Sequence, residues 1–195
     1  MSDEIVIKPK ASSKQKLIIL ISAFMALLFV GVMIIGLNLD QTKLPTTLIG
    51  KDAKSFKAEW VQGQEFVPSA SSTHFRLEDF KGKPLILNFW ASWCVSCRQE
   101  AHELEAFWRK YKDQGVAVVG IAIQDEVEAA QRFANEYRKS YILGLDEEGS
   151  VSLDYGVSGV PETFLIDSNG VIQHKEVGPV TFSMLESNLS KILKK

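Results

Sequence analysis

The 195-residue sequence predicts an α/β domain with a central mixed sheet flanked by helices, preceded by one N-terminal transmembrane helix. An uncharged apolar run at residues 17–39 predicts the transmembrane helix. Further along, a strand–helix–strand pattern covers residues 85–123, and an antiparallel hairpin pattern covers residues 163–177. The first pattern pairs its strands in parallel and the second pairs them antiparallel, so together they predict a mixed sheet.

The N-terminal apolar run is long enough to cross a bilayer as a helix, which takes about 20 apolar residues. A cleaved signal peptide, the first alternative, has a shorter apolar region of about 7–15 residues and a small-x-small cleavage site, which the following GLNLDQTKLP lacks. A buried core helix, the second alternative, is disfavoured because the run is apolar on all sides. A slight excess of lysines before the run favours a cytoplasmic amino terminus.

We therefore expect a cytoplasmic tail, a membrane anchor, a short linker and a folded domain, in that order, at residues 1–16, 17–39, 40–48 and 49–195. The first part of the domain has weak patterns. A strand is expected at residues 56–60, and a turn of helix followed by a tight turn is expected at residues 75–84.

The clearest patterns lie on either side of the two cysteines. Residues 85–90 (LILNFW) are almost continuously apolar, as in a strand covered on both faces. After Cys94 the apolar stripe of a helix recurs every three or four positions, at Cys97, Ala101, Leu104, Trp108 and Tyr111. Gly115 is expected to end this helix, and residues 116–123 (VAVVGIAI) read as a second buried strand.

The remaining elements follow in alternation. We expect a helix, a short strand, two hairpin strands around Ser168-Asn169-Gly170 and a closing helix, at residues 126–137, 141–146, 163–167, 171–177 and 182–193. Counted from the strand–helix–strand unit, the hairpin and the short strand between them, the sheet is expected to contain four or five strands.

The composition excludes several classes of function. A formal net charge of −2 gives no reason to expect a nucleic acid as partner. Two cysteines are too few for a disulfide scaffold or for a four-cysteine zinc site, and no two histidines stand at ligand spacing near them. We therefore expect neither a metal nor a cofactor.

The spacing of Cys94 and Cys97 points to dithiol chemistry. Cys94 falls where the strand ends and the helix begins, so a thiolate there meets unpaired backbone N–H groups and the positive end of the helix dipole. Both lower the pKa of the thiol below its free value of about 8.5, which makes Cys94 the expected nucleophile. Cys97 lies one helical turn further on, more shielded, and would resolve the mixed disulfide formed with a substrate.

The cysteine pair has two other interpretations, a structural disulfide and a metal site. A structural disulfide that closes so short a loop removes little chain entropy. A metal site, as in a copper chaperone, would need further soft ligands or a nearby histidine, and His102 does not share a helical face with Cys97. Both interpretations are therefore less favoured than redox exchange.

The residues around the cysteines resemble a known fold. FWASWCVSC resembles the active site of the thioredoxin fold, in which a buried strand leads into W-C-x-x-C. A second match is GVPETFLID at residues 159–167, whose proline resembles the cis-proline that packs beside the active-site cysteines in thioredoxin-like proteins. The resemblance implies a thioredoxin-like fold from about Ile49 onward, with a cis Val160–Pro161 bond.

Within this superfamily the chain is most similar to the membrane-anchored oxidoreductases of cytochrome c maturation, the CcmG/DsbE group, with TlpA and ResA types as relatives. The similarity rests on the anchor, on the WCxxCRxE pattern that ends at Glu100, and on Glu162 in the PETF run. It implies a periplasmic disulfide reductase that acts on the haem-binding cysteines of apocytochrome c, directly or through a handling factor. It also implies reduction by a transmembrane electron donor of the DsbD/CcdA type, and a single-pass position in the bacterial inner membrane with the C-terminal domain in the periplasm.

The chain departs from the family pattern in two places. Asn88, which cannot titrate, stands where thioredoxin has a buried aspartate, and Val95-Ser96 replaces the more frequent proline-containing dipeptide. The first departure suggests that Glu100 or Glu162 handles the proton of Cys97. As alternatives, Glu100 could be a solvated first-turn carboxylate and Glu162 an ordinary loop charge.

Two residues are expected to contact the substrate. Trp93 precedes the nucleophile, and the backbone at Val160, beside Pro161, could pair with an extended polypeptide; packing alone is the alternative for Trp93. Two other functions remain open, namely a general anchored reductase or oxidase and a copper chaperone.

Overall fold

The computed structural model describes residues 13–38 and 48–193. It divides into two compact units, residues 1–44 and 45–195, which we describe separately. Most of the expected cytoplasmic tail (1–16) and of the expected linker (40–48) lies outside the described residues.

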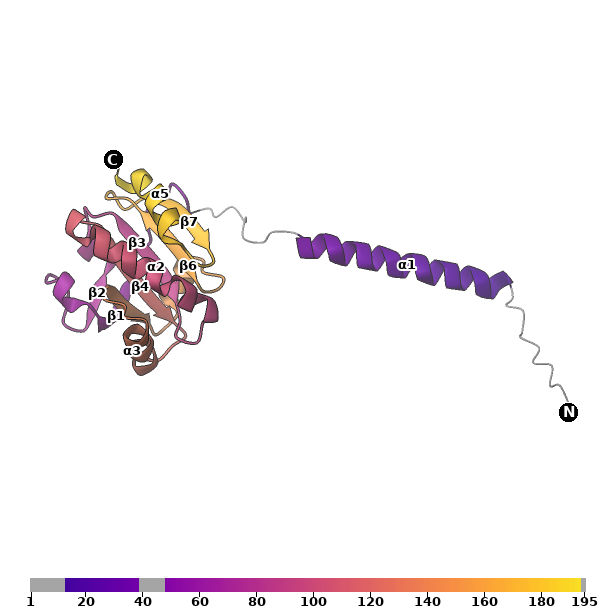
Figure 1. Ribbon diagram of the computed structural model, residues 1–195, viewed down its shortest axis with the longest axis horizontal. Helices are drawn as coiled ribbons and strands as arrows, with labels where there is room; N and C mark the ends of the chain where they lie inside the picture. The colour runs from indigo at the N-terminus through magenta and orange to yellow at the C-terminus, as the bar shows by residue number, and fades with distance from the viewer. Residues whose placement is uncertain (1–12, 39–47, 194–195) are drawn as a thin grey trace. The chain divides into compact units, whose positions relative to one another are not determined.

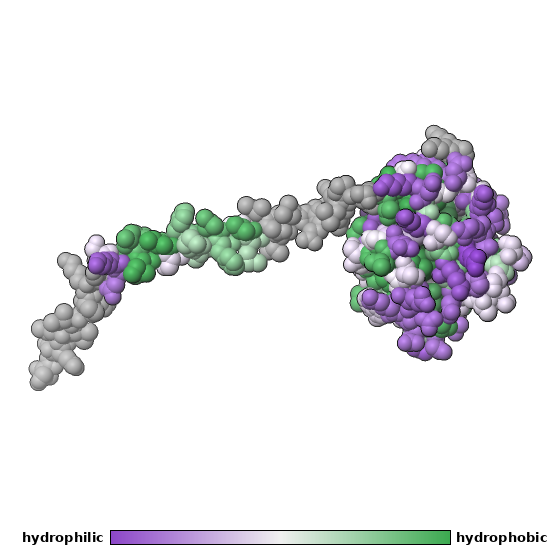
Figure 2. Space-filling view, turned by 180° about the vertical axis from the view of Figure 1, so that it is seen from behind, coloured by the Kyte–Doolittle hydropathy of each residue, from purple (hydrophilic) through white to green (hydrophobic). Residues whose placement is uncertain are grey.

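The first unit contains helix α1 (Ser13–Asn38), which covers most of the expected anchor. Among the described residues, Ser13–Ile34 is the one helical stretch long and apolar enough to cross a membrane, judged by length and composition. Its large apolar side chains are exposed, and Figure 2 shows the hydrophobic surface along the helix. So large an exposed apolar surface is typical of a segment that contacts lipid or another protein.

The second unit is built on a mixed sheet of seven strands in the described part of the chain, in the order β2-β1-β5-β4-β3-β6-β7 (Figure 1). The strands are β1 (Lys57–Gln62), β2 (His74–Arg76), β3 (Leu85–Trp90), β4 (Ala117–Ile123), β5 (Ile142–Asp146), β6 (Glu162–Ile166) and β7 (Ile172–Val177). Strand β3 lies inside the sheet, next to the central strand β4, and is parallel to β4 and antiparallel to β6. The predicted mixed sheet is confirmed.

The predicted number of four or five strands was wrong. Strand β2 is three residues long and pairs antiparallel with β1, which pairs in turn with β5. A strand this short shows no alternation in the sequence, and its first residue, His74, follows a run of small polar residues typical of a loop.

The helices of the second unit are α2 (Val95–Tyr111), α3 (Val127–Glu136), α4 (Ser150–Asp154) and α5 (Phe182–Leu193). Three short 3₁₀ helices accompany them, η2 (Gln64–Phe66), η3 (Leu77–Phe80) and η4 (Lys112–Gln114). Gly115, with φ 82°, ends η4 in the left-handed conformation that favours glycine, close to the predicted end. The sequence did not predict α4, because five residues carry too little periodicity.

Both faces of the sheet are covered, which explains why β3 reads as a continuous apolar run. Ile86 and Trp90 point to a core shared with α2, α3 and α5. Leu85, Leu87 and Phe89 point to a second core, shared with α4 and with the segment before β3. The C-terminal end of β3 is thus held rigidly from both sides, and it is from this end that the chain enters α2.

Gly144 in β5 provides a test of this packing. A Cβ atom at this position would lie 2.6 Å from two ring carbons of Phe75 and 2.9 Å from the Cβ atom of Ala58. We expect Gly144→Ala to lower the free energy of unfolding by about 1–3 kcal/mol, the usual cost of overpacking a core. The control is Gly159→Ala, where a Cβ atom meets nothing within 4 Å. Urea titration of the detergent-solubilised chain measures both, and equal stabilities would contradict the packing described.

Candidate dithiol site

Cys94 directly precedes α2 and follows the turn that leaves β3. It is the N-cap residue, with φ −79° and ψ 114°, and its Sγ accepts a hydrogen bond of 3.0 Å from the backbone N–H of Cys97. A sulfur that accepts a backbone N–H at the start of a helix is stabilised there in its negatively charged thiolate form. The local structure therefore matches the setting in which a thiolate was expected.

The turn before Cys94 is fixed to the segment that follows β4. The carboxylate of Asp125 accepts hydrogen bonds from the backbone N–H of Ser92 at 2.5 Å and from its hydroxyl at 2.8 Å. The indole N–H of Trp93 donates to the carbonyl of Gln124 at 3.0 Å, and the Trp93 side chain stays 53% exposed. Nothing in the sequence indicated Asp125, because its partners lie 33 positions away.

Cys94 and Cys97 form a disulfide in the structure, with Cα atoms 5.3 Å apart. Cys94 is 4% exposed and Cys97 is completely buried, which agrees with the expected difference in shielding. Among the described residues, no group of three or more His, Cys, Asp or Glu side chains could hold a metal ion. Of the two sulfurs, the less buried Cys94 is thus the one within reach of a partner.

The predicted cis peptide bond is confirmed. Val160–Pro161 is cis, and the carbonyl oxygen of Val160 lies 3.6 Å from the Sγ of Cys94. The loop that precedes β6 thus lies directly against the sulfur, although 66 residues separate the two in the chain. Val160 is half-buried and Gly159 exposed, so backbone beside Pro161 is accessible next to Cys94.

Glu100 is buried on α2, one turn beyond Cys97. One carboxylate oxygen accepts from the Asn88 side-chain amide at 2.8 Å, and the other accepts from the backbone N–H of Val180 at 3.0 Å. Burial raises the pKa of Glu100 to about 7, although these hydrogen bonds and the charge of Lys139 act in the opposite direction. The alternative of a solvated first-turn carboxylate was wrong, because position 100 falls on the face of α2 that packs against the sheet.

Asn88 explains how the buried acid is supported. It lies in the middle of β3, and its side-chain amide donates to Glu100 and, at 3.0 Å, to the hydroxyl of Thr163 on β6. The side-chain oxygen Oδ1 of Asn88 has no hydrogen-bond partner among the described residues. The residue in the place of the thioredoxin aspartate thus positions a titratable group that α2 supplies instead.

Glu162 is the first residue of β6 and is completely buried. Its carboxylate forms an ion pair of 2.7 Å with Lys175 on β7 and accepts hydrogen bonds from the backbone and hydroxyl of Ser158. The alternative of an ordinary loop charge was wrong, because Glu162 lies within the sheet.

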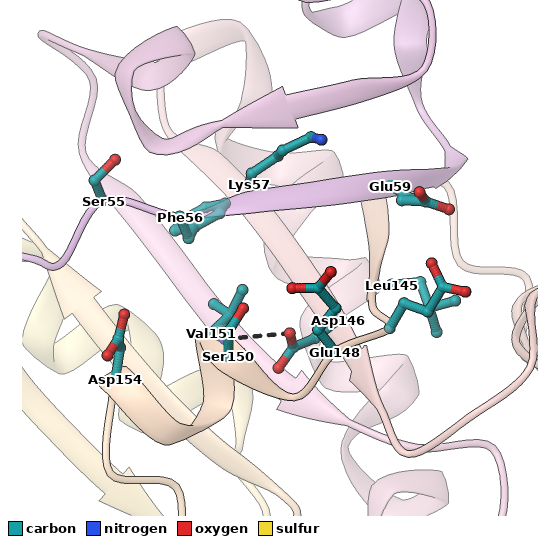
Figure 3. Close-up of a pocket in the computed structure, with 11 residues that line it drawn as sticks. Ser55, Phe56, Lys57, Glu59, Leu145, Asp146, Glu148, Ser150, Val151 and Asp154 are labelled. Carbon is teal, nitrogen blue, oxygen red and sulfur yellow. Dashed lines mark hydrogen bonds between the residues drawn. The ribbon is translucent and has the colours of Figure 1, made fainter.

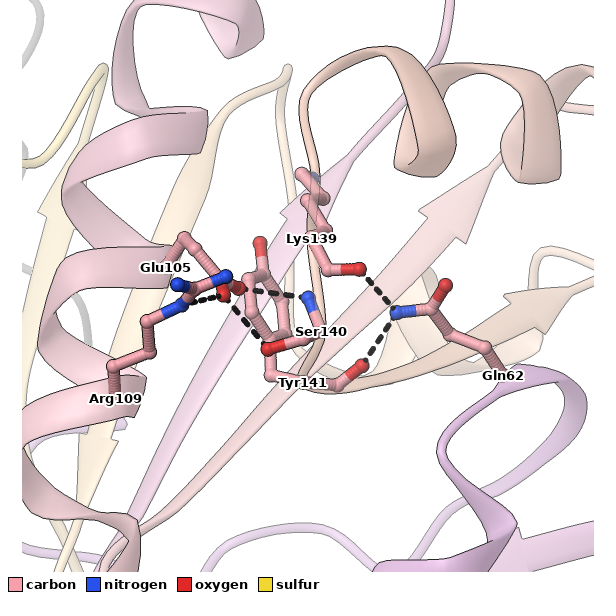
Figure 4. Close-up of polar contacts among 6 residues, drawn as sticks. All are labelled: Gln62, Glu105, Arg109, Lys139, Ser140 and Tyr141. Atoms are coloured by element: carbon pink, nitrogen blue, oxygen red, sulfur yellow. Dashed lines mark hydrogen bonds and ion pairs between the residues drawn. The ribbon is translucent and has the colours of Figure 1, made fainter.

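A group of charged and polar residues that the sequence did not indicate lies between α2 and the segment that leads into β5 (Figure 4). The ammonium group of Lys139 lies 3.7 Å from the centre of the Trp90 ring. Burial lowers the pKa of Lys139 to about 7, and the negative charges of Glu100 and Glu105 oppose this shift. Glu105 itself accepts from the backbone and hydroxyl of Ser140 and from Arg109. A single lysine between α3 and β5 carries no pattern from which this place could be predicted.

A separate hollow of about 210 Å³ lies between β1, the end of β5 and α4 (Figure 3). It is lined mainly by acidic and small polar side chains, and the Asp146 carboxylate in its wall accepts from the backbone N–H of Val151. No predicted site residue lines it. It is therefore not part of the dithiol site.

A buried strand that ends in a C-x-x-C pair at the start of a helix, with a cis-proline against the first sulfur, defines a thioredoxin-like thiol:disulfide oxidoreductase. A family model described as the AhpC/TSA family matches residues 49–175. The thiol:disulfide interchange protein DsbE of Pseudomonas aeruginosa is 40% identical over 158 residues, which cover 80% of this chain and 82% of that protein. The chain belongs to the AhpC/TSA family and, within it, to the DsbE-type thiol:disulfide interchange proteins.

Two further relatives agree with this assignment. The thiol-disulfide oxidoreductase ResA of Bacillus thuringiensis is 32% identical over 161 residues, covering 81% of this chain and 88% of that protein. A crystal structure from Chlorobium tepidum, described as a DsbE-type interchange protein, superposes with a TM-score of 0.64 at 28% identity, over 74% of this chain and 96% of that one. The predicted fold and the predicted enzyme class are both confirmed.

Proposed function

We propose that this protein is a membrane-anchored periplasmic reductase that acts on the haem-binding cysteines of apocytochrome c or on the factor that handles them. The observation that carries the proposal is the placing of Cys94, whose sulfur accepts a helix N-terminal N–H while Val160 lies against it. The similarity to DsbE and ResA proteins supports it, as does the apolar helix α1.

The proposed reaction is a two-step exchange that begins from the dithiol form. The Cys94 thiolate attacks one sulfur of the substrate disulfide, a mixed disulfide forms, and the released substrate sulfur takes up a proton. Cys97 then loses its proton and attacks the Sγ of Cys94, which yields the Cys94–Cys97 disulfide and the second substrate thiol. The substrate gains two electrons from the two cysteine sulfurs. Of its two protons, one comes from Cys97 and the other from solution, to which Cys94 gave up its proton when the thiolate formed.

The proton of Cys97 is handled by Glu100 in this scheme. A group with a pKa of about 7 is half ionised near neutrality, so it accepts and returns a proton with little cost at either step. Trp93 and the backbone of Val160 contact the substrate polypeptide beside Pro161. Glu162 is the other acidic residue assigned to this site.

The protein is held in the bacterial inner membrane by a single span at residues 17–39, with residues 1–16 in the cytoplasm, residues 40–48 as linker and residues 49–195 in the periplasm. A transmembrane donor of the DsbD/CcdA type restores the dithiol. A reporter active only outside the cytoplasm, fused after Lys195, tests this orientation. It should be active in the full chain and inactive when residues 17–39 are deleted.

Trapping in cells tests the substrate. A Cys97→Ser variant cannot resolve its mixed disulfide, so it should accumulate covalent complexes through Cys94. We expect apocytochrome c or one of its handling factors in these complexes, and the matched Cys94→Ser/Cys97→Ser variant should capture neither. Recovery of unrelated secreted proteins alone would contradict the cytochrome role.

The second candidate is a general anchored reductase or oxidase. The names of the relatives support it, since they specify thiol–disulfide chemistry without a substrate or a direction. A redox titration separates the two directions. A potential near that of DsbA, about −120 mV, would make the protein an oxidant and reverse the proposed reaction.

A further inference from the structure

Strands β6 and β7 contain a buried ion pair close to the dithiol. Glu162 and Lys175 approach to 2.7 Å, with side chains that are 0% and 11% exposed. The antiparallel register pairs Phe164 with Lys175, so Glu162 lies on the same face, diagonally opposite. Burying two charges is costly unless both are paired and hydrogen-bonded, so such a pair requires well-defined surroundings.

Both members of this pair also hold the loop that leads to Pro161. Glu162 accepts from the Ser158 backbone N–H at 3.0 Å and from its hydroxyl at 2.7 Å. Lys175 donates to the carbonyl of Gly156 at 3.2 Å. The loop is thus attached at two points, one to each charge.

The far end of the same loop contacts the nucleophile. The Val160 carbonyl lies 3.6 Å from Cys94 Sγ, and the carbonyl of Pro161 accepts from Gly178 N–H at 2.9 Å. Residues 158 and 159 are exposed, so the loop is held by its contacts with strands β6 and β7. Loss of the two attachments would leave the loop free to shift relative to the sulfur.

We propose that Lys175, acting through Glu162 and Gly156, is a positioning residue that holds the 156–161 loop where a polypeptide substrate is presented to Cys94. The proposal rests on the proposed reductase function. It assigns Glu162 to loop placement, while proton handling stays with Glu100. A small disulfide can reach Cys94 without contacting the loop, whereas a polypeptide is bound by it. The position of Lys175 therefore matters for polypeptide substrates.

The test compares two substrates on one variant of the full-length protein. Lys175→Met keeps the length of the side chain and removes its charge. We expect kcat/KM for the reduction of insulin disulfides to fall about tenfold or more, mainly through KM, because small misplacements of a binding segment have effects of this size. The rate with 5,5′-dithiobis(2-nitrobenzoic acid) should stay within about twofold, and Lys175→Arg should restore insulin reduction.

The matched control is Lys110→Met, which removes a lysine from the exposed ion pair with Glu186, far along α2 from Cys94. It should leave both rates unchanged. Should Lys175→Met not fold, Glu162→Gln/Lys175→Met replaces the pair by neutral groups, and the same split between substrates is expected. Equal losses on both substrates, or none on either, would overturn the proposal. Failure to trap a cytochrome factor would leave this split intact and so would concern the proposed function alone.

Discussion

We expect Cys94→Ser to abolish disulfide reduction, whereas Cys97→Ser should stop it at a covalent intermediate. The first variant has no sulfur at the N-cap of α2, so insulin reduction should fall to the background of solution thiols. The loss should be on the order of 10⁴-fold or more, as expected when a covalent nucleophile is removed. The second variant keeps the sulfur that attacks but lacks the buried one that releases the product.

Non-reducing electrophoresis and single-turnover kinetics distinguish the two variants. Cys97→Ser should show a mixed disulfide that forms at nearly the wild-type rate and persists, and Cys94→Ser should show none. Gln99→Ala, an exposed position on the same helix, serves as control and should turn over normally. Full turnover by Cys97→Ser, or a stable mixed disulfide with Cys94→Ser, would contradict the roles assigned to the two sulfurs.

Glu100→Gln should have the next largest effect, and it should depend on pH. Since the pKa of Glu100 is raised to about 7, the carboxylate is available as a base only above that pH. We expect the step that releases the mixed disulfide to slow by about 10²-fold or more at pH 8 and to lose its inflection near pH 7. Rapid-quench measurements of that step across pH 5 to 9 test this.

The same group should be visible in the stability of the protein. Its pKa is higher in the folded chain than the usual 4.5, so the folded state holds the proton more tightly. The stabilisation is therefore complete below about pH 4.5 and is lost as pH rises toward 7, a fall of up to about 3 kcal/mol. Glu100→Gln should remove this slope, whereas the exposed Glu128→Gln should keep it. A slope unchanged in Glu100→Gln would contradict the buried, titrating carboxylate.

Much of the dithiol site could be predicted from the sequence because it is local. The apolar run of β3, the helical stripe after Cys94 and the motif around Pro161 each lie within a few residues. The cis bond was predicted by resemblance, since sequence periodicity does not indicate peptide geometry. What the local patterns predicted least well was the short strand β2, which pairs at the edge of the sheet.

The residues that support the site were not predicted, for a common physical reason. Asp125, Lys139 and Lys175 act on partners in other elements, and their positions become meaningful only when the sheet brings those elements together. Glu100 was recognised as a candidate, but its burial was not. An acidic residue in a first helical turn is usually solvated, and only the contacts with Asn88 and Val180 place it inside.

The pH dependence of alkylation measures the activation of Cys94 most directly. The Cys97→Ser variant, fully reduced, is treated with iodoacetamide between pH 4 and 10, so that the rate reports one thiol. Because the sulfur accepts the N–H of residue 97 and faces the start of α2, the apparent pKa should lie below the free value of about 8.5. A value at or above 8.5 would show that the helix does not hold a ready thiolate there, and the proposed chemistry would have no nucleophile.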